Sequence, residues 1–238
     1  MNGPIKTLLF DFGGTLDADG VAWKERFHAL YRSEGLDMAG DAFAPAFYAA
    51  DDPLVGGLSP RTDLSGTVQA LTANLESELA RCCVGRDRIK IDSSSDRGRR
   101  VVSGFLSDAL ATFERNRPVL KALSERYQLG IVSNFYGNLE AVCQSAGLCS
   151  FFKVIVDSYC VGAEKPDPAI FRAALERLGA TPEKTVFIGD SLRRDREGAR
   201  RTGMRFIRIA PLDVQDAQAD RQAESAVTDL HDLTKILQ

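Results

Sequence analysis

The sequence lacks a strong charge imbalance, a long apolar run and any C-x-x-C pair of cysteines. Its 238 residues carry a net charge of -3, which argues against a surface for nucleic acid or an anionic membrane. No apolar run approaches the roughly 20 residues of a membrane helix. No basic segment leads into an apolar one, so we expect no signal peptide. The five cysteines are an odd number without a C-x-x-C pair, unlike a disulfide framework or a zinc knuckle. We therefore expect a cytoplasmic protein with reduced thiols.

The composition is that of a globular protein. Hydrophobic residues make up 44% of the chain and charged residues 26%. The length suits one large domain, or a core with a smaller insert. Basic residues gather in residues 86–100, where RDRIK and DRGRR surround IDSSSD. Such charge runs are typical of solvated loops, and we expect one here.

Five short apolar runs are rich in Val, Ile, Leu or Phe, as strands buried on both faces of a parallel sheet are. They are residues 5–10, 129–134, 153–158, 185–190 and 204–209. Helical patterns at 138–148, 167–179 and 191–203 separate the last four runs. Asp167 is placed as the N-cap of the second helix, with Pro168 at its first position. The alternation predicts an α/β fold with a doubly wound parallel sheet.

The first apolar run lies far from the second in the sequence, and the interval between them has no strand pattern. Helical patterns occur there at 21–35, 41–50, 64–83 and 100–116. We therefore predict a core domain of residues 1–16 and 116–238 and an inserted helical cap domain of residues 17–115. The turn-rich segment DDPLVGG, residues 51–57, is predicted as a hinge between cap helices.

Polar side chains lie at the ends of the predicted strands. Asp11 follows the first strand, Ser133 and Asn134 end the second, and Asp190 ends the fourth. Lys165, in GAEKPDP, follows the third. Ligands of open α/β sheets bind outside the carboxyl ends of the strands, so we expect these side chains to meet in one crevice.

Such a set suits phosphoryl transfer. Asp11 and Asp190 can hold Mg²⁺ through oxygen atoms. Lys165 would neutralise a phosphoryl group, while Ser133 and backbone N–H groups would donate hydrogen bonds to its oxygens. Asp11 can attack phosphorus, because carboxylates form aspartyl-phosphate intermediates. Alone, a strand-end aspartate is more often a helix cap and a loop lysine more often solvated, so the prediction depends on the whole set.

In four segments the sequence resembles the haloacid dehalogenase-like (HAD) hydrolase superfamily. They are FDFGGTL, VSN, EKPDPAIF and IGDSLRRDREGARRTGM, in the family's order. The interval after the first segment resembles the family's helical type 1 cap. The resemblance implies a Rossmann-like core, Asp11 as the nucleophile, and Ser133, Asn134 and Lys165 as the residues that bind the transferring group.

The same resemblance implies a magnesium site and its supports. Asp190 matches a magnesium ligand, and the backbone carbonyl of Gly13 can serve as another. Asp195 matches an acidic residue that supports the lysine or the metal shell, and Thr15 is assigned a supporting role. Arg194 departs mildly from the family, because many members have Asn there.

Gly13 is the main departure. Family phosphatases usually have an aspartate there, which protonates the leaving group and later activates water. Losing such an acid typically costs about 10²–10⁴-fold in rate. Turnover is therefore slow, or another group acts, or the substrate has a good leaving group. Asp17 and Asp19 are candidates, although residues of this kind are more commonly surface turn residues.

Other family branches also lack this acid. Dehalogenases displace halide without magnesium, but Asp190 favours a metal site. Phosphonate hydrolases use a cap lysine, but neither Lys24 nor Lys90 has an obvious apolar setting. The leading hypothesis is a Mg²⁺-dependent phosphatase that acts on a small phosphate monoester through Asp11. The alternatives are a metal-independent dehalogenase-type hydrolase and a catalytically weak HAD fold that binds a phosphorylated metabolite.

The first predicted cap helix carries four candidate substrate contacts, which are Trp23, Arg26, His28 and Arg32. Trp23 shares a helical face with Phe27, which favours a core position. Arg26 would bind phosphate or carboxylate if it faced the crevice. The substrate and the oligomeric state stay open.

Overall fold

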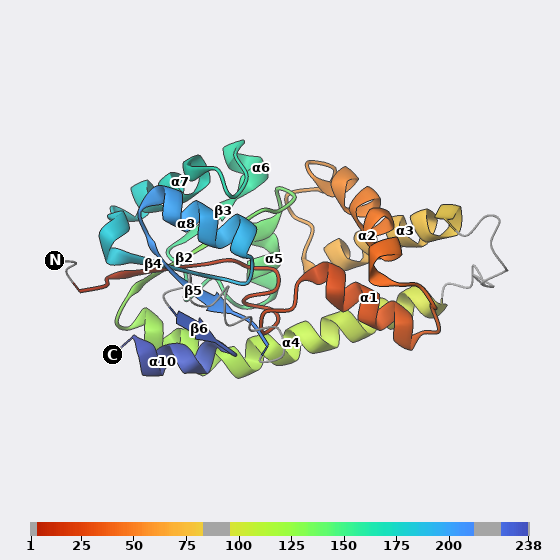
Figure 1. The fold of residues 1–238 in the computed structure, drawn as a ribbon, viewed down its shortest axis with the longest axis horizontal. Coiled ribbons are helices and arrows are strands. Elements are labelled where there is room, and N and C mark those ends of the chain that lie inside the picture. The colour runs from red at the N-terminus through yellow and green to blue at the C-terminus, as the bar shows by residue number, and fades with distance from the viewer. Residues whose placement is uncertain (1–3, 83–95, 212–224, 238) are drawn as a thin grey trace.

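The computed structural model describes residues 4–82, 96–211 and 225–237. Six strands form one parallel sheet in the order β3-β2-β1-β4-β5-β6 (Figure 1). They are β1 (Thr7–Phe10), β2 (Gln128–Ser133), β3 (Val154–Asp157), β4 (Thr185–Gly189), β5 (Arg205–Ile209) and β6 (Ser225–Val227). The predicted doubly wound α/β sheet is confirmed. The sequence interpretation missed β6, because its three residues form no apolar run.

Helices cover both faces of the sheet. Side chains alternate along each strand, so Leu9 and Phe187 face one side and Phe10 and Ile188 face the other. α7 (Pro168–Leu178) and α8 (Glu197–Thr202) pack on the first side. The second side is covered by α5 (Leu139–Ser145), α10 (Leu233–Ile236) and the second half of α4 (Asp96–Ser124). Short turns complete this part: α6 (Ser158–Val161), η2 (Pro182–Lys184), η3 (Leu192–Arg196) and η5 (Leu230–Asp232).

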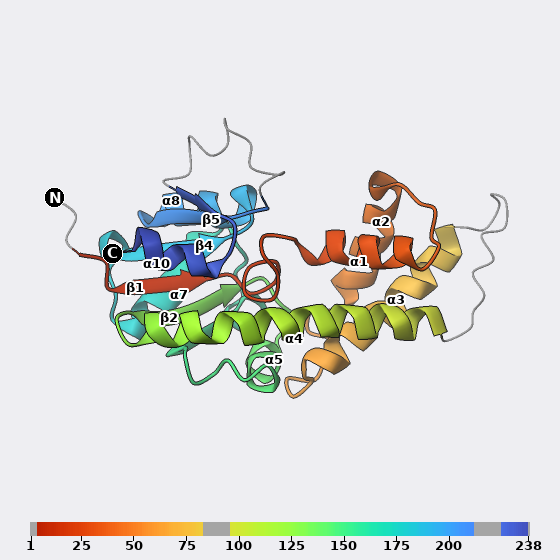
Figure 2. The same ribbon diagram turned by 90° about the horizontal axis from the view of Figure 1, so that it is seen from below.

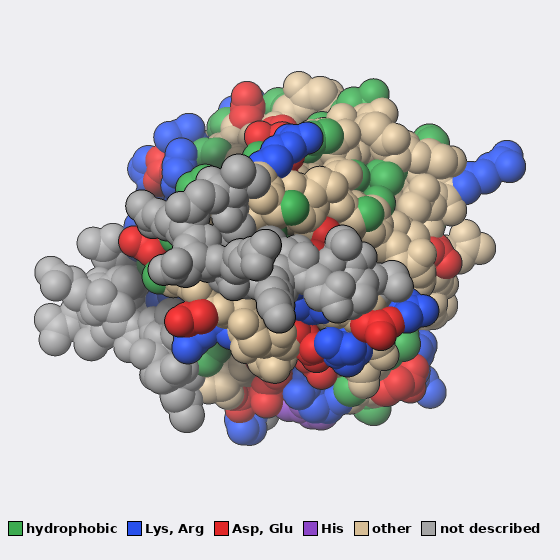
Figure 3. All heavy atoms as spheres, turned by 90° about the vertical axis from the view of Figure 1, so that its right-hand side faces the viewer, with side chains coloured by type: hydrophobic (Ala, Val, Ile, Leu, Met, Phe, Trp, Pro, Cys, Tyr) green, Lys and Arg blue, Asp and Glu red, His purple; other side chains and the backbone are tan. Residues whose placement is uncertain are grey.

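The described residues of the interval between β1 and β2 are mainly helical, as predicted. It contains α1 (Trp23–Ser33), α2 (Gly40–Asp51), the turn η1 (Asp52–Leu54), α3 (Leu64–Cys82) and the start of α4. These helices lie beyond one end of the sheet (Figures 1 and 2). On the face that Figure 3 shows, acidic and basic side chains of the described residues are interspersed.

α4 joins the helical insert to the sheet. It is one helix of 29 residues with Pro118 inside it, and Figure 2 shows it running beneath both parts. The predicted domain boundary at 115/116 therefore falls within a continuous helix. The division into domains and the hinge at 51–57 stay predictions.

Some sequence predictions fall on residues outside the described part, including 86–95 of the basic segment with Lys90, and Cys83. The described cysteines are Cys82, Cys143, Cys149 and Cys160, and each is free. Within the described ranges, no helix is both long enough and apolar enough to cross a membrane.

Candidate active site

Asp11 is placed at the centre of the sheet by strand register. Phe10 pairs with Ile131 in β2 and with Ile188 in β4. The Asp11 N–H continues this pattern by donating to the carbonyl of Ile188 at 2.9 Å. The next residue of the central strand therefore lies between the ends of its two neighbours, beside Ser133.

Three donors hold one oxygen of the Asp11 carboxylate. Oδ1 accepts from Ser133 Oγ at 2.7 Å, from Lys165 Nζ at 2.8 Å and from the Phe12 N–H at 2.7 Å. Asp11 itself is only 5% exposed. Among the described residues, none makes a hydrogen bond or ion pair with Oδ2. The carboxylate is therefore held in one orientation with its second oxygen left for chemistry.

Lys165 is buried between two carboxylates. Its Nζ lies 2.7 Å from Asp195 Oδ1 and 2.8 Å from Asp11 Oδ1. Burial alone would lower the pKa of Lys165, but Asp11 and Asp195 outweigh it and raise the pKa. Asn134 holds the lysine's backbone at both ends: the Lys165 N–H donates to Oδ1 at 2.7 Å, and Nδ2 donates to the Lys165 carbonyl at 3.2 Å. Asn134 thus positions the lysine, and its predicted contact with phosphate stays a prediction.

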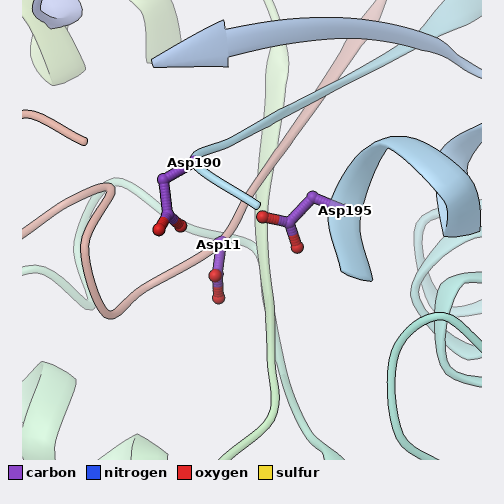
Figure 4. Close-up of side chains that lie close together, drawn as sticks. All are labelled: Asp11, Asp190 and Asp195. Carbon is purple, nitrogen blue, oxygen red and sulfur yellow. The ribbon is translucent and has the colours of Figure 1, made fainter. Parts of the chain in front are cut away.

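Asp11, Asp190 and Asp195 form a cluster in which one carboxylate oxygen from each residue lies within 4.8 Å of the other two (Figure 4). Asp195 is fully buried and also accepts from the Ser191 N–H at 2.9 Å. Burial, followed by the charges of Asp195 and Asp11, raises the pKa of Asp190 to about 8. Thr15 Oγ1 lies 3.4 Å from Asp190 Oδ1. Burial alone would lower the pKa of Arg194, but the charges of Asp11, Asp195 and Asp190 outweigh it and raise the pKa, so the cluster favours a nearby cation.

Two glycines let the backbone pass close to these carboxylates. Gly14 has φ +88°, and a Cβ atom there would lie 2.9 Å from Asp190 Oδ2. A Cβ atom at Gly189 would collide with the carboxyl group of Asp195. The carboxylates can therefore lie this close to the backbone because glycine has no side chain at these two positions.

Gly13 and Asp17 belong to one buried arrangement. A Cβ atom at Gly13 would lie 3.2 Å from Trp23 Nε1. That nitrogen donates to Asp17 Oδ2 at 2.7 Å, and Arg26 binds the same oxygen at 2.6 Å. Asp17 Oδ1 accepts from the Gly14 N–H at 2.7 Å, and Asp17 has no exposed surface. Asp17 is therefore neither a surface turn residue nor free to replace the missing acid.

A cavity of about 450 Å³ lies above this cluster, between the sheet and the helical insert. Asp11, Gly13, Ser133, Asn134, Lys165 and Asp190 line it, so the structure brings six of the predicted site residues together. Asp195 and Thr15 lie buried behind them. The insert contributes Trp23, Lys24, Glu25, Phe47, Tyr48 and Asp51.

A family model for haloacid dehalogenase-like hydrolases matches residues 5–203. The chain belongs to this family. It is therefore a hydrolase. The haloacid dehalogenase-like hydrolase domain-containing protein 3 of Danio rerio is 37% identical over 109 residues, 46% of this chain and 45% of the relative. The glyceraldehyde 3-phosphate phosphatase of Methanopyrus kandleri is 44% identical over 72 residues, 30% of this chain and 31% of the relative. The chain thus spans less than half of each of these relatives in the matched segments.

Solved structures of the family share the fold. The HAD-hydrolase YfnB of Bacillus subtilis, solved with magnesium, has a TM-score of 0.61 at 20% identity, covering 99% of both chains. The 2-haloacid dehalogenase of Pseudomonas syringae has a TM-score of 0.54 at 23% identity, covering 98% of both. At these identities the likeness shows the fold alone, and it does not separate phosphatase from dehalogenase activity.

The predicted cap contacts of this HAD-like hydrolase are mostly placed elsewhere. Arg26 pairs with Asp17 and stacks 3.8 Å from the centre of the Phe105 ring, away from the cavity. His28 Nε2 contacts the Met38 carbonyl at 2.7 Å, and Arg32 is exposed. Trp23 is a core residue that also lines the cavity.

The sequence interpretation of this HAD-like hydrolase missed several cavity residues, among them Tyr48, Asp51 and Tyr136. Tyr48 and Asp51 are three residues apart and so share a face of α2. That spacing is the only local signal for them. Tyr136 lies two residues beyond Asn134, outside the segment that the strand pattern covers. Asp19, the second suggested acid, pairs instead with Arg115 at 2.7 Å.

Proposed function

We propose that this HAD-like hydrolase is a Mg²⁺-dependent phosphatase that acts on a small phosphate monoester through an aspartyl-phosphate on Asp11. The main support is the carboxylate of Asp11, in which Ser133, Lys165 and a backbone N–H hold Oδ1 while Oδ2 has no partner among the described residues. The names of two relatives, glyceraldehyde 3-phosphate phosphatase and phosphoserine phosphatase, support a phosphorylated substrate.

The donor set fits Mg²⁺. This ion prefers oxygen ligands, usually one or two carboxylates with substrate phosphate and water. Asp11 and Asp190 supply the carboxylates and Gly13 a backbone carbonyl, and all three line the cavity. When bound, the ion would neutralise phosphoryl oxygens and so stabilise the charge of the transition state. Asp195 is already engaged by Lys165 and Ser191, so we assign it to the lysine rather than to the ion.

The chain's own residues then act as follows. Asp11 Oδ2 forms a bond to phosphorus as the bond to the leaving oxygen breaks. The ammonium of Lys165 and the hydroxyl of Ser133 bind the phosphoryl oxygens, where charge develops. Water then attacks phosphorus, phosphate leaves, and Asp11 is restored.

An activated aryl phosphate tests this function. Phosphate release by wild type should require Mg²⁺, and Asp11→Asn should abolish it. Asp167→Asn is a matched control, because Asp167 is an exposed N-cap near Lys165 and asparagine caps helices equally well. Wild-type protein that is inert with Mg²⁺ would overturn the proposal.

Gly13 is also compatible with the dehalogenase-type alternative, because displacement of halide needs no proton donor to the leaving group. That activity would release halide from a 2-haloacid without metal, and Asp190→Asn would leave it unchanged. A binding protein would instead bind inorganic phosphate by calorimetry without turning over any phosphate ester.

A further inference from the structure

We propose that the carboxyl group of Asp51 is the general acid and base of this enzyme, in place of the side chain that Gly13 lacks. The role rests on the phosphatase function proposed above. Asp51 is the last residue of α2 in the helical insert, and it lines the same cavity as Asp11 and Gly13.

A core residue holds Asp51 at the cavity. Tyr136 OH donates to Asp51 Oδ1 at 2.5 Å, and Tyr136 lies three residues beyond Ser133 on the segment that leaves β2. The Gly56 N–H also donates to the Tyr136 carbonyl at 3.0 Å. The end of α2 and the loop after it are therefore bonded to the core beside the catalytic residues, and Oδ2 of Asp51 has no partner among the described residues.

The other nearby carboxyl groups are committed elsewhere. Asp11 and Asp190 are the proposed nucleophile and metal ligand. Glu25 lines the cavity but forms an ion pair with Lys24 at 2.7 Å. Of the described carboxyl groups that line the cavity, Asp51 alone forms no ion pair and has no role in the proposed metal site.

The surroundings of Asp51 favour a bound proton. Burial is the largest effect, and it raises the pKa of Asp51. The hydrogen bond from Tyr136 and the charge of Arg194 lower the pKa, and the charge of Asp52 raises it further. The net direction is upward. The position at the carboxyl end of α2 acts in the same sense, because the helix dipole disfavours negative charge there. A general acid must carry its proton near the working pH, so this direction is the one that the role needs.

The proton balance is complete. As Asp11 Oδ2 bonds to phosphorus, the Asp51 carboxyl gives its proton to the leaving oxygen, and an alcohol departs. The Asp51 carboxylate then takes a proton from the water whose oxygen attacks phosphorus. The bond from Asp11 to phosphorus breaks, and both residues return to their starting state. Tyr136 keeps its proton and is a positioning residue.

Leaving groups of different acidity test this role, because a proton donor matters little when the leaving group is a stable anion. We would measure kcat/KM with Mg²⁺ for nitrophenyl phosphate, phenyl phosphate and glycerol phosphate. Asp51→Asn should lose about 10²–10⁴-fold on glycerol phosphate, the range typical for a general acid, and less than about tenfold on nitrophenyl phosphate. Asp37→Asn, at an exposed position of the insert that does not line the cavity, should match wild type on all three substrates.

Three results would overturn the role. An equal loss of kcat/KM on all three substrates would show that Asp51 has a structural role. No loss on any substrate would show that Asp51 takes no part in the reaction. Wild type that fails even on nitrophenyl phosphate would overturn the phosphatase function first, and this role with it. If Asp51→Asn does not fold, Tyr136→Phe keeps the carboxyl group and should still lose more on glycerol phosphate than on nitrophenyl phosphate. An equal loss there would count against the proposal.

Discussion

Trp23 Nε1 lies 2.7 Å from Asp17 Oδ2, and the same nitrogen would lie 3.2 Å from a Cβ atom at Gly13. The side chain that binds the buried carboxylate therefore crowds the position at which an acidic side chain on residue 13 would begin. The missing acid and the buried ion pair are two parts of one arrangement, and a single substitution cannot restore the usual phosphatase pattern without disturbing Trp23.

Gly13→Asp should therefore destabilise the protein rather than simply add an acid. Overpacking of a well-filled site typically costs about 1–3 kcal/mol, and we expect a loss of unfolding free energy in that range. Urea denaturation measures it. Gly40→Asp is the control, because a Cβ atom there would lie an ordinary 3.6 Å from His28 and an acid suits the start of α2. Equal stability of Gly13→Asp and wild type would show that the Trp23 side chain can move aside without an energetic cost.

Asp17→Asn, which replaces a charged side chain by an uncharged one of similar size, should strongly lower the unfolding free energy. It leaves Arg26, only 8% exposed, without its carboxylate partner. Removing one partner of a buried pair typically costs about 3–5 kcal/mol, and we expect a loss of that size in urea denaturation. Adding Arg26→Met should recover part of it, because no buried charge then remains. Asp37→Asn, at an exposed position, should change stability by no more than about 0.5 kcal/mol. Equal losses for Asp17→Asn and Asp37→Asn would contradict the argument.

The fold was predictable because its signals are local. A parallel strand buried on both faces is a continuous apolar run, and four of the predicted strands alternate with helices of ordinary spacing. Since the carboxyl ends of such strands meet, the gathering of Asp11, Ser133, Lys165 and Asp190 also followed from the sequence. β6 was missed because three residues at a sheet edge carry no pattern.

Contacts between distant residues could not be predicted in the same way. Asp17 stands in LDADG, whose composition is that of a surface turn, and only Trp23 and Arg26 on the following helix explain its burial. Asp51 and Tyr136 are 85 residues apart, and their contact depends on how the insert sits on the core. Periodicity places such residues on a face of their own helix, but not against a partner.

The stability of the protein should depend on pH through Asp51. Burial raises the pKa of Asp51 in the folded protein above its ordinary value of 3.8. A group of this kind stabilises the fold fully below its unfolded pKa, and that contribution is lost as the pH rises through the folded pKa. The asparagine side chain of Asp51→Asn cannot ionise, so this variant does not lose that contribution. The unfolding free energy of Asp51→Asn, relative to that of wild type, should therefore increase as the pH rises from 4 to 8. Denaturation across this range, with the exposed-site variant Asp37→Asn alongside, measures the difference. A gap between Asp51→Asn and wild type that does not vary with pH would show that burial does not raise the pKa of Asp51.

Gly14 offers a test of the cation site that does not depend on turnover. Gly14 and Gly162 both have positive φ, at +88° and +72°, so alanine at either position should cost about 1–2 kcal/mol of backbone strain. They differ in their surroundings: a Cβ atom at Gly14 would lie 2.9 Å from Asp190 Oδ2, whereas one at Gly162 would meet nothing within 4 Å. Calorimetry should therefore show that Gly14→Ala weakens Mg²⁺ binding, because the methyl group displaces the Asp190 carboxylate, while Gly162→Ala binds as wild type does. Equal Mg²⁺ affinity in the two variants would place the ion away from Asp190.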